Sequence, residues 1–112
     1  MTGPTDDPHL PADLVAQYLR ASRERVALVE QMAARLAADA GDRAALESLR
    51  HEAHLVFGGA ATFGFPEAGR IAQALEDTAK RWLAETGPAA DPRGAVVRRF
   101  AAELRRAFEG RP

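Results

Sequence analysis

The glycines and prolines of this chain divide it into four stretches with helical periodicity, and the first is unusually long. From Ala12 to Asp39 there is no glycine or proline. Apolar or small residues recur there at alternating spacings of three and four, which predicts an amphipathic helix. A helix of that length would extend about 42 Å, so it either breaks near Ser22–Arg23 or its first half overhangs the rest of the fold. The stripe is Val15, Leu19, Ser22, Val26, Val29, Ala33 and Leu36, with Leu14, Tyr18, Ala21, Leu28 and Met32 beside it.

Three further helical stretches follow, each bounded by stop and start signals. Gly41 is a stop signal and Asp42 an N-cap, which predicts a helix from about Arg43 to Thr62. Pro66 starts the next, which ends before Gly87–Pro88. Asp91–Pro92 starts the last, which ends at Gly110. Short connections favour antiparallel neighbours, so the sequence predicts an all-α, antiparallel up-down four-helix bundle. The inward positions are Leu46, Leu49, Ala53, Val56, Ala60, Phe63, Ala68, Ala72, Leu75, Ala79, Trp82, Val97, Phe100, Leu104 and Phe108.

Composition supports the helical prediction and excludes several classes. The 112 residues include 25 alanines, and 14 of the 15 basic residues are arginine; both are strong helix formers. The length predicts one domain. The polar, glycine- and proline-containing residues 1–10 predict a flexible leader, and the bundle is expected at 11–110. A net charge of −1 argues against a nucleic-acid binder. There is no cysteine, no secretory signal and no membrane-length apolar run, so we expect a cytoplasmic protein.

One segment does not fit a plain bundle. Gly58 and Gly59 lie inside a helical pattern, where each costs about 1 kcal/mol relative to alanine. A small residue there permits something else to approach closely. His54 directly follows the core position Ala53, so its side chain is turned about 100° from the core stripe. The residues one turn away share its surface patch: Arg50, His51, Phe57, Gly58 and, one turn further, Ala61.

The segment from His54 to Gly64 resembles the histidine phosphotransfer (HPt) family. The family pattern is a histidine, an aliphatic residue two positions on, then a glycine, small residues, an apolar residue and a second glycine. The continuation from Phe65 to Glu76 also resembles the family's next helix. By motif the resemblance covers about 45–77, and by helix arrangement about 12–109. The matching residues are His54, Val56, Gly58, Ala60, Ala61, Phe63 and Gly64.

The resemblance implies a function in multistep phosphorelays. HPt domains are four-helix bundles whose exposed histidine takes a phosphoryl group from the phospho-aspartate of one receiver domain and passes it to another. By this carry-over His54 is the phosphoacceptor, and Gly58 gives the receiver's active site room. Its partners would be response-regulator receivers or a hybrid histidine kinase. The receiver would supply Mg²⁺, and no cofactor or metal site is expected on this chain, which also lacks a nucleotide-binding loop for kinase activity of its own.

The sequence departs from the family pattern at two positions. The family often has lysine three residues after its histidine, and here Phe57 stands there; Arg50 is a candidate for supplying the positive charge instead. Gly59 replaces the more usual serine, which we interpret as a minor change. Glu76 matches a frequent polar partner of the family's histidine. Its carboxylate could orient the imidazole, but it would also repel the phosphoryl group.

The residues around His54 also allow other interpretations. His51 is a surface residue of the partner-binding patch, and a His51–His54 metal pair lacks a third ligand. Phe57 either contacts a receiver or packs in the core. Rival functions are a helical adaptor that no longer transfers phosphate, favoured by Phe57, and a homodimeric scaffold built on the first helix; a monomer is preferred to a homodimer. The basic cluster of the last helix is interpreted as a solvated face: Arg98, Arg99, Arg105 and Arg106.

Overall fold

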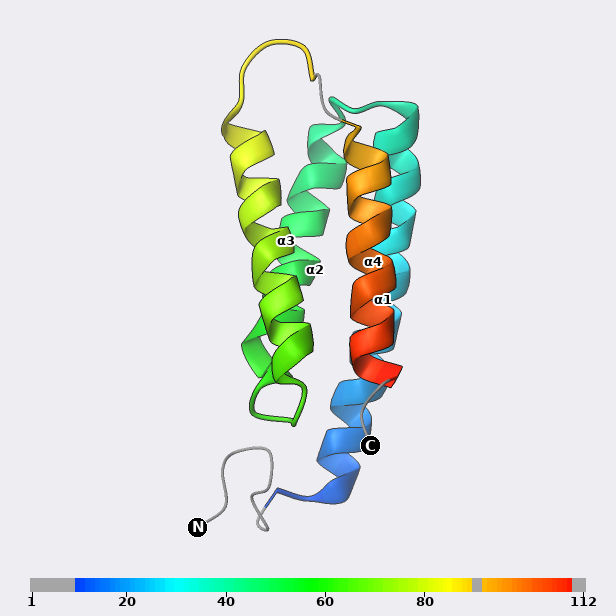
Figure 1. Cartoon of the computed structure of the whole chain (residues 1–112), viewed down its shortest axis with the longest axis vertical. Coiled ribbons are helices and arrows are strands. Elements are labelled where there is room, and N and C mark those ends of the chain that lie inside the picture. Colours follow the sequence, from blue (N-terminus) through cyan, green and yellow to red (C-terminus); the bar gives the residue numbers. More distant parts are fainter. Residues whose placement is uncertain (1–9, 90–91, 110–112) are drawn as a thin grey trace.

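The fold is an all-α antiparallel four-helix bundle, as the sequence predicted. The computed structural model describes residues 10–89 and 92–109. Within these ranges it contains four helices and no strand: α1 (Ala12–Ala38), α2 (Arg43–Ala60), α3 (Pro66–Ala84) and α4 (Arg93–Glu109). Helix α1 packs against α2 and α4, and α3 packs against the same two (Figure 1). The predicted leader apart from Leu10, the Asp91 cap and the Gly110 stop lie outside the described residues.

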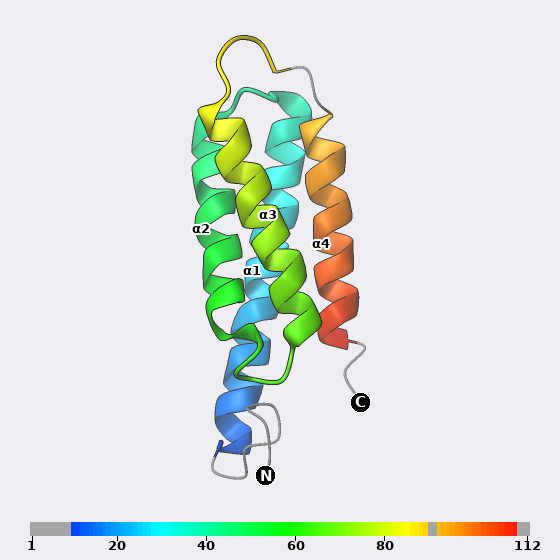
Figure 2. The ribbon, with the colours of Figure 1, turned by 60° about the vertical axis from the view of Figure 1, so that its left-hand side comes forward.

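Helix α1 is continuous from Ala12 to Ala38, so of the two alternatives that the sequence left open, the overhang is observed and the break near Ser22–Arg23 is not. Ser22 is buried in the core stripe, and the residues around it remain helical. A small side chain at a core position keeps the apolar period intact, and nothing there interrupts the backbone hydrogen bonds. The buried residues of α1 begin at Ser22. The turns before it extend past the ends of the other helices in both views (Figures 1 and 2).

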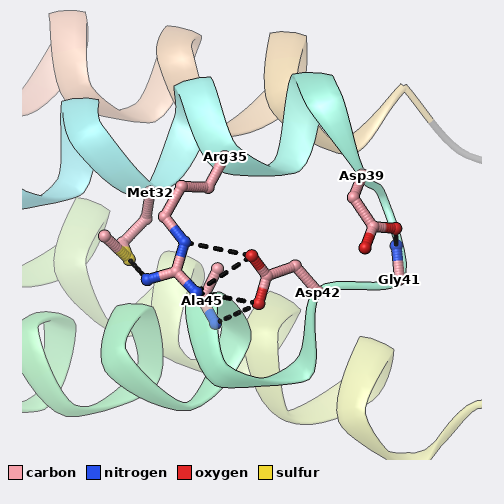
Figure 3. A network of polar contacts seen from close by, with 6 residues as sticks. All are labelled: Met32, Arg35, Asp39, Gly41, Asp42 and Ala45. Atoms are coloured by element: carbon pink, nitrogen blue, oxygen red, sulfur yellow. Dashed lines mark hydrogen bonds and ion pairs between the residues drawn. The ribbon is translucent and has the colours of Figure 1, made fainter.

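The turn between α1 and α2 is fixed by the predicted cap, Asp42. Its Oδ1 accepts a hydrogen bond from the amide of Ala45 at 3.0 Å, and Arg35 on α1 donates from Nε and Nη2, each at 3.0 Å (Figure 3). This one carboxylate therefore caps α2 and ties it to α1. Helix α1 ends at Ala38, because Asp39 is extended, so the chain leaves the helix before Gly41.

The core is formed by apolar faces of all four helices, and most predicted inward positions are buried. Trp82 is buried, as predicted, whereas Phe63 and Phe100 are only half-buried and Leu28 is exposed. Helix α2 ends at Ala60 rather than Thr62, and Gly64, with a φ of 95°, turns the chain into α3. Small residues let neighbouring helices approach closely: a Cβ at Gly94 on α4 would lie 2.6 Å from the backbone nitrogen of Ala37 on α1.

The Asp42 cap predicts a specific acid sensitivity. The amide of Ala45 and the guanidinium of Arg35 hold the pKa of Asp42 below its usual value, although partial desolvation opposes them. A depressed pKa means that the carboxylate contributes stability above the unfolded-state pKa, which is lost as the pH falls through the folded-state value. Asp42→Asn keeps a capping side chain but cannot ionise. We expect its free energy of unfolding to fall less than that of the wild type between about pH 5 and pH 2, as measured by urea denaturation.

The matched control for this measurement is Asp77→Asn, which removes an exposed carboxylate of α3. The control should follow the wild-type pH dependence. Parallel curves for Asp42→Asn and the wild type would show that the Asp42 carboxylate does not contribute to acid sensitivity.

Candidate functional site

The site is built on the exposed face of α2, around His54. The preceding residue, Ala53, and Val56 are completely buried, and they fix that side of the helix against the core. With 3.6 residues per turn, the His54 side chain is turned about 100° from that of Ala53. The His54 side chain is accordingly 61% exposed. The core therefore sets the direction in which the imidazole leaves the helix.

A buried carboxylate from α3 holds one side of the imidazole. Oε2 of Glu76 lies 3.1 Å from Nδ1 of His54, and the Glu76 side chain is only 8% exposed. An ionised carboxylate can only accept hydrogen bonds, so in the neutral imidazole this contact favours the tautomer with the proton on Nδ1 and the lone pair on Nε2. The same Oε2 lies 3.4 Å from Nζ of Lys80, one turn along α3. The carboxylate is thus shared by an imidazole and an ammonium group.

The other predicted site residues lie at the surface around His54, but they do not all contact it. Phe57 is 39% exposed, so it is not a core residue. His51, Gly58 and Ala61 are also exposed. The Nε of Arg50 contacts Glu47 at 3.3 Å, on its own helix. The hydrogen bonds and ion pairs of the described residues include none between Arg50 and His54.

The two adjacent glycines have different surroundings. A Cβ at Gly58 would meet nothing within 4 Å, so the surface beside His54 is open there. A Cβ at Gly59 would lie 2.7 Å from Cε1 of Tyr18, in the overhanging part of α1. The replacement of serine at Gly59, interpreted as minor from the sequence, is therefore required by internal packing. The group that lies close to Gly59 is Tyr18 of this same chain. Of the two glycines, only Gly58 leaves space for another molecule.

Tyr18 was not singled out by the sequence, although it connects α1 to the site helix. Its hydroxyl donates a hydrogen bond to the carbonyl of Val56 at 2.7 Å, and its ring stacks on Phe63 with centroids 4.7 Å apart. Burial raises the pKa of the Tyr18 phenol, while a hydrogen bond with Ser22 and the charge of Arg25 lower it in part. The available signal was its place in the second apolar stripe of α1. This tyrosine clamps the last turns of α2.

Lys80 was also missed, and it joins the site through Glu76. The spacing of four between Glu76 and Lys80 was the only sequence signal, and such pairs are common on solvated helix faces. Across the described ranges there is no group of three or more histidine, cysteine or acidic side chains placed to hold a metal ion. None of the described helices is long and apolar enough to cross a membrane.

The fold and site together define a class of protein: a four-helix bundle that displays an exposed histidine backed by a buried carboxylate from the neighbouring helix. A comparison with known protein families matches residues 13–109 to the family described as Hpt domain. The chain belongs to this family of histidine phosphotransfer domains. Comparisons with curated proteins and with solved structures found no match.

The contrast between the two glycines can be tested by stability alone. Gly58→Ala should raise the free energy of unfolding by up to about 1 kcal/mol, because alanine is the better helix former and its Cβ meets nothing. Gly59→Ala should lower it by about 1–3 kcal/mol, because the Tyr18 ring must move. Urea denaturation of both variants checks this, and the opposite order of stabilities would contradict the assignment of the space at each glycine.

Proposed function

We propose that this chain is a phosphotransfer protein of a two-component phosphorelay, with His54 as its phosphoacceptor. Membership of the Hpt family supports a phosphotransfer role. The observation that carries the assignment to His54 is the exposed imidazole whose Nδ1 contacts the buried carboxylate of Glu76. This geometry leaves Nε2 as the nucleophilic nitrogen. Glu76 is the orienting residue.

The transfer reaction needs only this nitrogen from the chain. The lone pair of Nε2 attacks the phosphorus of an aspartyl phosphate, the P–N bond forms, and the P–O bond breaks to release the aspartate carboxylate. Nδ1 keeps its proton throughout and stays hydrogen-bonded to Glu76. The reverse step, on a second receiver, passes the group on. Positioning and charge stabilisation supply most of the catalysis in phosphoryl transfer, and the receiver would provide Mg²⁺ and an acidic pocket.

The surface around His54 is proposed to dock the receiver. Phe57 and His51 would contact the partner, and Gly58 and Ala61 would let it approach the helix. Arg50 is a candidate electrostatic helper, provided that it leaves Glu47. Residues 11–110 would form the functional unit behind a short leader, acting as a monomer in the cytoplasm, where receiver domains and histidine kinases exchange phosphoryl groups.

A phosphotransfer assay tests the assignment. A purified receiver carrying labelled phosphate on its aspartate is mixed with the wild type, with His54→Gln and with His9→Gln. We expect label on the wild type and on His9→Gln but none on His54→Gln, because His54 is the histidine of the described residues whose exposed imidazole contacts a buried carboxylate. The label should be acid-labile, as expected of a phosphohistidine, and peptide mass spectrometry should locate it on residue 54.

Two other outcomes would change the conclusion. If no receiver labels the wild type but receivers still bind it, the chain is a non-transferring adaptor, which the exposed Phe57 at the position of the family's lysine favours. If His54→Gln is labelled as well as the wild type, the phosphoacceptor is another residue. Light scattering over a range of concentrations separates a monomer from a scaffold that dimerises through α1.

A further inference from the structure

The oxygen atom that contacts His54 has a second ion-pair partner. Oε2 of Glu76 lies 3.1 Å from Nδ1 of His54 and 3.4 Å from Nζ of Lys80. Because both nitrogens contact one oxygen, the ammonium group lies within two contact lengths of the imidazole ring. The carboxylate is buried, whereas the Lys80 side chain is 56% exposed. Lys80 is also the only lysine of the chain.

This arrangement addresses an electrostatic conflict in the site. A carboxylate that fixes the imidazole also stands beside the phosphoryl group that the imidazole would carry. Like charges at such separations repel, and burial of one of them reduces the screening by water. The position three residues after His54 holds Phe57, which cannot neutralise either charge. Arg50 is engaged by Glu47 on the same helix.

We propose that Lys80 is a positioning residue of this site, which compensates the charge of Glu76 so that the carboxylate can orient His54 without destabilising its phosphorylated form. This role rests on the proposed function of His54. In the resting state, Lys80 and His54 share the carboxylate. After the P–Nε2 bond has formed, Nδ1–H still donates to Glu76, and the ammonium group offsets the carboxylate beside the added phosphate charge.

The compensating cation therefore lies on α3 rather than on α2. Lysine suits this role because its ammonium group is a compact charge on a flexible stem. Since the Lys80 side chain is more than half exposed, water screens part of its effect. We therefore expect Lys80 to change the lifetime and the yield of the phosphohistidine by a modest factor rather than to be indispensable.

The test compares Lys80→Met with Arg81→Met, which removes one positive charge from an exposed side chain of the same helix. Each full-length variant is phosphorylated by a labelled receiver, the receiver is removed, and the loss of label is followed. The phosphohistidine half-life of Lys80→Met should be roughly 2- to 5-fold shorter than that of the wild type. Arg81→Met should match the wild type, and Lys80→Arg should restore most of the lifetime. Lys80→Gln provides a second neutral variant if the methionine variant is poorly folded.

A double variant shows whether Lys80 acts through Glu76. Once Glu76→Gln has removed the carboxylate charge, there is nothing for Lys80 to compensate, so adding Lys80→Met to Glu76→Gln should leave the half-life nearly unchanged. A purely structural effect of Lys80 would instead shorten the half-life in both backgrounds. Circular dichroism melting of every variant identifies any effect that comes from loss of fold.

The outcomes separate the two proposals. If the wild type is labelled on His54 and Lys80→Met decays at the same rate as Arg81→Met, the role of Lys80 is wrong and the proposed function stands. Equal effects of Lys80→Met with and without Glu76→Gln would also overturn it. If no receiver labels the wild type, the proposed function fails and the role of Lys80 fails with it.

Discussion

The site depends on the close approach of α2 and α3, because Glu76 can reach His54 only if the two helix axes lie near each other. Small buried residues line this interface. A Cβ at Gly69 would lie 3.2 Å from the Cβ of Ala60, which is tighter than ordinary van der Waals contact. Helices separate when larger side chains meet between them. The abundance of alanine therefore does more than favour helix: it brings a carboxylate of one helix under an imidazole of the next.

The overhang of α1 supports the same helix from its other end. Tyr18 reaches the carbonyl of Val56, two residues after His54, and its ring occupies the space that a side chain at Gly59 would need. After α2, Gly64 has a positive φ, and its amide and that of Phe65 donate hydrogen bonds to the carbonyls of Ala61 and Ala60. The Tyr18 contacts therefore add a tertiary restraint to a turn that is already closed locally. The part of α1 that extends beyond the bundle thus helps to fix the C-terminal turns that follow the proposed phosphoacceptor.

Local sequence signals predicted the parts of this structure that local physics determines. Helical periodicity located four helices and most of the core, and the Asp42 cap was predicted because its hydrogen bond spans only three residues. Signals that depend on tertiary packing were misjudged or missed. The length of α1 left undecided whether the helix breaks near Ser22–Arg23. The need for a glycine at position 59 comes from the ring of Tyr18, which is 41 positions away in the chain. The buried guanidinium of Arg93, which donates to the carbonyl of Ala40 and to Glu85, belonged to no pattern.

The division between buried and exposed residues on α2 explains how the exposed side chain of His54 is held in a fixed direction. Ala53 and His54 are neighbours, as are Val56 and Phe57, and the first of each pair is buried while the second is exposed. The buried residue of each pair sets the rotation of the helix about its axis, and that rotation determines the direction in which the exposed side chain points. A core substitution that rotated α2 slightly about its axis would move Nδ1 of His54 away from Glu76 without changing either side chain. The chemistry proposed for His54 is thus governed by packing on the opposite side of its own helix.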